Sequence, residues 1–248
     1  MSTNSGRLLT RALWCATGFL VLLGVFAAVL RALQIPDSIT RAEPVRQSLL
    51  DVFHVIDPFA SDRAAELDRV DHRYANHPVV TLLHVLPGAV LLVLMPLQFS
   101  PRVRNRFITF HRWSGRFLLL TSMVVVPAGL FFGVGMPWGG AGEAVGVTLA
   151  GALFLVSVSL AFLAIRKGDV ARHREWMVRA FAIAIGISTV RVVGLVFDVT
   201  LTAAGVRPPA VFVLSIWTGW LLTIGVAETW IRYTRPARLV RPAGPSYS

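Results

Sequence analysis

The chain has 248 residues, of which 55% are hydrophobic and 15% are charged, and its mean hydropathy is +0.66. Soluble domains carry about 25% charged residues, so this composition excludes a soluble globular protein and indicates a protein whose solvent is a lipid bilayer. The net charge of +11 comes largely from arginines in short loops and tails, a signal of membrane topology, so no nucleic-acid partner is expected.

Six apolar runs reach the roughly 20 residues that a helix needs to cross about 30 Å of hydrocarbon. They are residues 12–33, 79–99, 117–136, 145–165, 180–201 and 211–231. The first run exceeds the roughly 7–15 apolar residues of a signal peptide and lacks an Ala-x-Ala cleavage site, so we expect it to stay attached as an anchor. The sequence therefore predicts an all-α fold, a polytopic transmembrane bundle of six helices.

The arginines predict the orientation of this bundle, because short loops rich in Lys and Arg stay in the cytoplasm. Arginines gather in the N-terminal tail, around 102–116 and 166–179, and after 231, whereas 34–76 and 139–144 hold more acids than bases. We therefore expect both termini in the cytoplasm of a bacterium, a multi-pass protein of the plasma membrane, and anionic lipid headgroups at its cytoplasmic face. The predicted segments are a tail with the first helix (1–33), an extracytoplasmic segment (34–76), a four-helix core (77–201), the sixth helix (202–231) and a basic tail (232–248).

Two features outside the core carry limited chemistry. The single cysteine, Cys15, lies in the first span, so one chain forms neither a disulfide nor a thiolate metal cluster. In the external segment, two stretches are predicted as short amphipathic helices that lie on the membrane or cap the bundle. They are Leu49, Leu50, Val52, Phe53 and Ile56, and residues 60–70.

The second span presents a polar stripe on one helical face, formed by His77, Thr81, His84 and Gly88. Pro87 cannot donate a backbone hydrogen bond, so we expect a kink and a free carbonyl acceptor next to His84. His84 is predicted about 7 to 8 Å below the outer surface. It serves either as a hydrogen-bonded structural residue or as a ligand.

The fifth span has an equally polar face that runs from His173 through Ser188 and Arg191 to Asp198. An arginine facing lipid is costly, so this face is expected to point into the bundle, with Ser188 or Asp198 as the acceptor for Arg191. Arg191 either forms a structural ion pair or carbonyl contact, or holds an anionic group. Together with His84 it is predicted to form an outer polar cluster.

At the cytoplasmic face, His111 and His173 open the third and fifth helices in two similar strings, His111-Arg112-Trp113-Ser114-Gly115-Arg116 and His173-Arg174-Glu175-Trp176-Met177-Val178-Arg179. Two neutral imidazoles from different helices are able to hold one metal ion or a haem iron. The alternative is a structural belt in which Arg116 and Arg179 reach toward headgroups. Glu228 either pairs with an arginine or acts as a proton-carrying group.

An ordered set of motifs resembles an uncharacterised family of bacterial multi-pass membrane proteins over residues 76–195. The motifs are His77-Pro78, His84, Gly88, Pro96-Leu97-Gln98-Phe99, His111-Arg112-x-x-Gly115-Arg116, Asp169, His173-Arg174-x-Trp176-Met177-x-Arg179 and Arg191, with Met95 and Phe117 where the family pattern often has Gly and Tyr. The resemblance implies a membrane fold and no established activity. A more distant likeness to b-type membrane cytochromes implies one haem, or one metal ion, at His111 and His173, with His84 as a further candidate.

Two functions follow as hypotheses, and neither settles whether the protein is an enzyme. The first is a membrane redox protein that binds b-type haem or a metal ion through His111 and His173 and passes electrons to a quinone, with Arg191 and His84 lining an outer pocket. The second is a non-catalytic transporter, assembly factor or accessory subunit with a membrane protein partner, in which Arg191, Asp198 and Glu228 form a polar path or interface.

Overall fold

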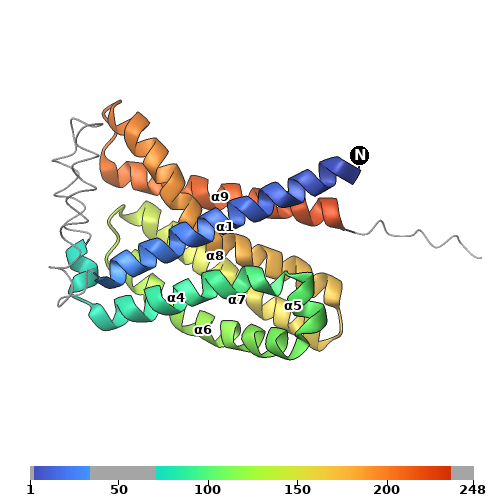
Figure 1. Ribbon diagram of the computed structural model, residues 1–248. Helices are drawn as coiled ribbons and strands as arrows, with labels where there is room; N and C mark the ends of the chain where they lie inside the picture. The colour runs from blue at the N-terminus through green and yellow to red at the C-terminus, as the bar shows by residue number, and fades with distance from the viewer. Residues whose placement is uncertain (1–2, 34–70, 236–248) are drawn as a thin grey trace, which may run out of the picture.

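The computed structural model describes residues 3–33 and 71–235, and within these ranges the chain is helical, with no strand (Figure 1). The elements are α1 (Thr3–Leu33), α4 (Pro78–Gln98), α5 (Pro101–Arg106), α6 (Ile108–Gly135), α7 (Ala141–Arg166), α8 (Val170–Phe197), the π-helix η1 (Asp198–Thr202) and α9 (Pro208–Thr234). Six helices in the described ranges are long and apolar enough to cross a membrane. The predicted all-α, six-span bundle is confirmed, whereas the orientation and the division into five segments stay predictions.

The helices begin where local chemistry favours a start. Proline, which suits the first turn of a helix, opens α4, α5 and α9. Gly168, at φ +75°, turns the chain before α8, and the Asp169 carboxylate accepts the backbone N–H of Arg172 at 2.9 Å. Both α6 and α8 start before the predicted spans, because hydropathy detects only the apolar stretch and their polar first turns are helical too.

The six long helices alternate in direction, so arginines far apart in the chain gather at one end of the bundle. This arginine-rich end carries the start of α1, the end of α4, α5, the α7–α8 turn and the end of α9, on the right in Figure 1. The opposite end carries the end of α1, the start of α4 and the connection from η1 to α9. The two predicted amphipathic helices between α1 and α4 lie outside the described residues.

Small residues let α8 and α9 approach closely. A methyl group at Gly186 of α8 would lie 2.1 Å from Cδ1 of Trp220, and one at Gly219 of α9 would lie 2.7 Å from Cγ2 of Val190. Trp220 also donates a 3.1 Å hydrogen bond from Nε1 to the carbonyl of Ile183. Close approach at small residues is the usual basis of helix association in membranes, where hydrocarbon offers no hydrophobic driving force between helices.

The apolar core lies between α4, α6, α7 and α8, and α1 lies outside it. Buried side chains of that core include Leu91, Met95, Leu118, Phe154 and Ile183. In α1, only 6% of the apolar window is buried, and the buried residues of its described part are Gly24 and Ala28, one turn apart. Most of the α1 surface is therefore available to lipid.

Candidate functional site

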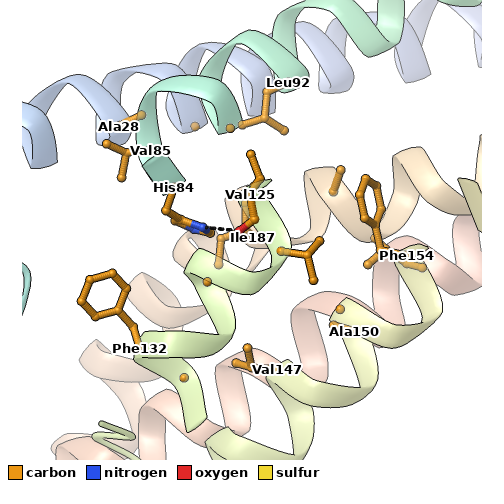
Figure 2. Close-up of a pocket in the computed structure, with 18 of the residues that line it drawn as sticks. Ala28, His84, Val85, Leu92, Val125, Phe132, Val147, Ala150, Phe154 and Ile187 are labelled. Carbon is orange, nitrogen blue, oxygen red and sulfur yellow. Dashed lines mark hydrogen bonds between the residues drawn. The ribbon is translucent and has the colours of Figure 1, made fainter. Parts of the chain in front are cut away.

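A cavity of about 300 Å³ lies among the long helices in the half of the bundle away from the arginine-rich end. We name it the His84 cavity. Figure 2 shows the imidazole of His84 among apolar side chains of the cavity wall, including Phe132, Phe154 and Ile187. Its polar lining consists of Arg31, Tyr74, His84, Glu143, Arg191 and Trp220. The two residues of the predicted outer cluster that matter most, His84 and Arg191, thus border one cavity.

The polar stripe of α4 faces the bundle, as its spacing predicts. Nδ1 of His77 lies 2.9 Å from the carbonyl oxygen of Arg73, and the hydroxyl of Thr81, which is fully buried, donates to the carbonyl of Tyr74 at 2.8 Å. Further along the same face, His84 lines the cavity. The first two polar groups are therefore satisfied by the chain just before α4.

The ring of His84 is fixed by α6. Nδ1 lies 2.9 Å from the carbonyl oxygen of Val125, and a carbonyl only accepts, so Nδ1 carries the proton (Figure 2). The neutral ring then has its lone pair on Nε2, for which the described residues supply no hydrogen bond. Pro87 lies inside α4, as expected, yet the partner of His84 comes from another helix.

Arg191 is the least compensated charge at the cavity. Its Nη1 donates to the carbonyl of Ile187 at 3.0 Å, and no carboxylate of the described residues lies within ion-pair distance. Ser188 does not accept from Arg191, because the long side chain folds back one turn to the backbone; this is the carbonyl contact that the sequence analysis gave as an alternative. Arg191 borders the cavity, and its side chain is exposed.

Four polar residues of the cavity were not predicted as site residues, namely Arg31, Tyr74, Glu143 and Trp220. Arg31 pairs with Asp71, and its guanidinium carbon lies 4.3 Å from the ring centroid of Tyr74. Glu143 is buried and accepts the backbone N–H of Gly139 at 2.7 Å. The sequence signal for Arg31 is a charge in the last turn of a span, and that for Glu143 is an acid directly before one.

His111 and His173 both lie at the arginine-rich end of the bundle. Each is the fourth residue of its helix, α6 and α8. Nδ1 of His173 lies 2.9 Å from the carbonyl oxygen of Ala161, which leaves Nε2 for another partner, and Nδ1 of His111 is buried without a hydrogen bond. Within the described residues, no group of three or more His, Cys, Asp or Glu is placed to hold a metal ion.

Glu228 forms an ion pair with Arg179, the first of the two roles predicted for it. Its carboxylate accepts from Nε of Arg179 at 2.5 Å and from Nη2 at 3.1 Å, and the same guanidinium lies 4.7 Å from the ring centroid of Trp176. Glu175 accepts two bonds from Arg235, of 2.7 and 2.9 Å, and this contact raises the pKa of Arg235 by favouring its charged form. These ion pairs tie α8 to α9 and to the chain directly after it.

The other predicted polar residues, Arg116 and Asp198, do not line the His84 cavity. The guanidinium carbon of Arg116 lies 5.1 Å from the ring centroid of Trp113, near the start of α6. Asp198 begins η1, beyond the end of α8. Of the polar residues predicted in the outer half of the bundle, His84 and Arg191 line the cavity and Asp198 does not.

The sequence matches a known protein family. A family model described as "Predicted membrane protein (DUF2306)" matches residues 81–231, more than half of the chain. The chain belongs to this family. No curated protein and no solved structure matches it. The predicted membership of an uncharacterised membrane protein family is confirmed, and the likeness to b-type cytochromes stays a prediction.

Within the DUF2306 region, a buried contact joins two of the sequence motifs. Nε2 of Gln98, at the end of α4, donates to the hydroxyl of Ser114 in α6 at 2.8 Å, and that hydroxyl donates to the carbonyl of Phe110 at 2.5 Å. The Pro-x-Gln-Phe motif thus fixes the start of the helix that carries His111. Sequence reasoning noted both motifs without predicting their contact, because nothing in the spacing of two helices sets their relative rotation.

Proposed function

We propose that this membrane protein binds a small amphipathic organic anion in the His84 cavity. The observation that carries the proposal is the guanidinium of Arg191, which lies in a membrane-spanning helix, borders the cavity and has one backbone carbonyl as its partner. Charged side chains inside membrane-spanning helices are costly, and they pair with one another or with backbone carbonyls. Arg191 has one such carbonyl, and in this proposal the ligand supplies the counter-charge.

The charges around the cavity support a ligand with one negative charge. Arg31, Arg73 and Arg191 are cationic, whereas Asp71 and Glu143 are the nearby acids, and Asp71 already pairs with Arg31. Among the described residues around the cavity, one positive charge is therefore in excess. A carboxylate fits this excess and the planar donor geometry of a guanidinium.

Two further properties of the cavity restrict the ligand. Nε2 of His84 is a hydrogen-bond acceptor, so the ligand carries a hydroxyl group beside its carboxylate. The remaining wall is apolar, including Phe132, Phe154 and Ile187, and a volume of about 300 Å³ is at the small end for ligand pockets. A hydroxy acid with a short hydrocarbon body meets all of these conditions. Such binding corresponds to the transporter alternative of the sequence analysis.

The redox hypothesis is the second candidate, and the hydrogen bonds of the histidines favour it. Backbone carbonyls fix Nδ1 in both His84 and His173, and no described residue forms a hydrogen bond to Nε2 of either ring. Histidine ligands of metals are held in this way by a bond to the second nitrogen. In this candidate, His111 and His173 hold a haem or a metal ion, and a quinol donates its hydroxyl to His84.

The arrangement of charges also supports a location. We propose that the arginine-rich end lies in the cytoplasm of a bacterium, against the anionic headgroups of the plasma membrane. What supports this is that Arg102 and Arg104 of α5, Arg166 of α7 and Arg172 of α8 gather at one end of the bundle. The opposite end then faces outward, with the His84 cavity in the outer half.

Binding is tested on the purified protein in nanodiscs with 3-hydroxyoctanoate, octanoate and 3-hydroxyoctanamide as probes. We expect the hydroxy acid to bind at least about tenfold more tightly than either analogue, since each lacks one of the two polar contacts. Arg191→Met is expected to abolish the preference for acid over amide and to raise the melting temperature, because it removes an unpaired charge. Arg207→Met, an equal change in charge outside the cavity, is the control.

The opposite result is equally informative. If Arg191→Met lowers the melting temperature and leaves the binding of all three probes as in the control, Arg191 is a structural residue and the proposal is wrong.

A further inference from the structure

A second cavity, of about 520 Å³, lies between the first half of α1 and the helices α4, α8 and α9. We name it the Arg174 cavity. Along α8 it extends from Arg174 to Thr189, which is about 22 Å at a rise of 1.5 Å per residue. Along α1 it extends from Thr10 to Leu20. The cavity is therefore long and runs with the helices, in a part of the bundle that spans the membrane.

The Arg174 cavity is polar at one end only. The residues that line it from α1 and from α8 are mostly apolar, for example Leu13, Phe181 and Ile185. Its charged lining residues are Arg104 from α5 and Arg174 from the first turn of α8, both at the arginine-rich end. An elongated apolar space with cations at its headgroup end has the polarity of an anionic lipid.

In the described part of the chain, neither arginine is neutralised by an acid. Arg174 donates from Nη2 to the hydroxyl of Thr234 at 3.0 Å, and neither Arg174 nor Arg104 has a carboxylate of the described residues within ion-pair distance. The acids of the neighbouring helices are already engaged, Glu175 by Arg235 and Glu228 by Arg179. Two guanidiniums beside the opening of an apolar cavity therefore lack a counter-charge.

We propose that the Arg174 cavity holds one acyl chain of an anionic phospholipid from the surrounding bilayer, with its phosphate between Arg104 and Arg174. Arginines at the interface attract anionic lipids, and a guanidinium forms paired hydrogen bonds to phosphate. The sparse burial of α1 leaves the cavity open to lipid along that helix. This proposal is independent of the ligand of the His84 cavity, which is lined by different residues.

The test compares retention of phosphatidylglycerol and of phosphatidylcholine with identical acyl chains, measured by native mass spectrometry on protein released from nanodiscs. We expect phosphatidylglycerol to be retained preferentially, and Arg104→Gln and Arg174→Gln each to reduce its affinity by about fivefold. The matched control for each is a single variant, Arg102→Gln or Arg112→Gln, which removes the same charge from the same end without touching the cavity. It is expected to retain the lipid as the unmodified protein does.

A second pair of variants tests the chain rather than the headgroup. Ala16→Trp places a large side chain into the apolar part and is expected to lower retention of the lipid, whereas Ala12→Trp, also exposed on α1 but outside the cavity lining, is expected to leave it unchanged. The proposal is overturned if both lipids are retained equally, or if Arg104→Gln and Arg174→Gln retain phosphatidylglycerol as well as the control does. The glutamine variants change side chains at the helix ends, so they test the proposal even if Ala16→Trp fails to fold.

Discussion

Gly129 of α6 leaves the space that the imidazole of His84 fills from α4. A methyl group at Gly129 would lie 2.7 Å from Cε1 of the ring and 3.1 Å from Nδ1. The ring is therefore held against α6 by the hydrogen bond to the carbonyl of Val125 and by its close approach to the backbone of Gly129, one turn further along that helix. The absence of a side chain at Gly129 thus determines the direction in which Nε2 of His84 points.

Gly129→Ala is expected to displace the ring of His84 and to lower the free energy of unfolding by roughly 1–3 kcal/mol, the usual cost of overpacking. Binding of 3-hydroxyoctanoate is expected to weaken with it. The control is Gly135→Ala on the same helix, where an added methyl meets no atom within 4 Å. Thermal denaturation and binding of both variants are the measurements. Equal behaviour of the two variants would show that the position of the ring does not matter.

Breaking the pair between Arg179 and Glu228 is expected to destabilise the contact of α8 with α9. Both side chains are partly exposed, at 23% and 34%, so Glu228→Ala is expected to cost about 1–3 kcal/mol rather than the full cost of a buried pair. Arg235→Ala removes a pair whose arginine is 57% exposed and is expected to lower the melting temperature less.

The double variant Arg179→Met with Glu228→Met is the control for this pair. We expect it to recover stability relative to Glu228→Ala, because two apolar side chains leave no unpaired charge. If the double variant is less stable than Glu228→Ala, the ion pair contributes more than its desolvation costs.

The histidine pair has a spectroscopic test. If His111 and His173 hold a haem, the protein purified in detergent shows a Soret band and a reduced-minus-oxidised difference spectrum. Both are then lost in His111→Ala and in His173→Ala, and metal analysis gives one ion per chain. His77→Ala, which removes a histidine bonded to the carbonyl of Arg73, is expected to leave the spectrum unchanged. Absence of both chromophore and metal in the unmodified protein would remove the redox candidate.

The orientation is tested by labelling with an impermeant maleimide in intact cells. Cys15→Ser gives a background without cysteine, since Cys15 is the single cysteine of the chain. In that background, Ala204→Cys, between η1 and α9, is expected to react from outside, whereas Lys167→Cys, between α7 and α8, is expected to react only after the membrane is permeabilised. The reverse labelling pattern would mean that the bundle has the opposite orientation in the membrane.

The fold was predictable because the bilayer constrains it strongly: backbone groups must be satisfied internally, so long apolar runs are helices. The same logic placed His84 and Arg191 on inward faces, and the structure brings them to one cavity. It did not predict their partners, Val125 and Ile187, because both bonds end on backbone carbonyls, which every residue carries.

Partners on other helices were also beyond the sequence. The pairing of Glu228 with Arg179 depends on the rotation of α9 relative to α8. That rotation is set where Trp220 packs against Gly186 and Val190 packs against Gly219. Periodicity within one helix contains no information about this angle. Arg31 was overlooked for a related reason, since its role depends on Tyr74, which lies beyond the long segment after α1.

The position of Gly24 has a mechanical consequence for α1. A methyl group there would lie 2.5 Å from Oγ of Ser188, so the helix touches α8 closely at this point. The His84 cavity borders α1 on one side of this contact, at Ala28 and Arg31, and the Arg174 cavity borders it on the other, at Leu20 and earlier residues. Because this contact lies between the two cavities, a tilt of α1 about Gly24 that widens one cavity would narrow the other.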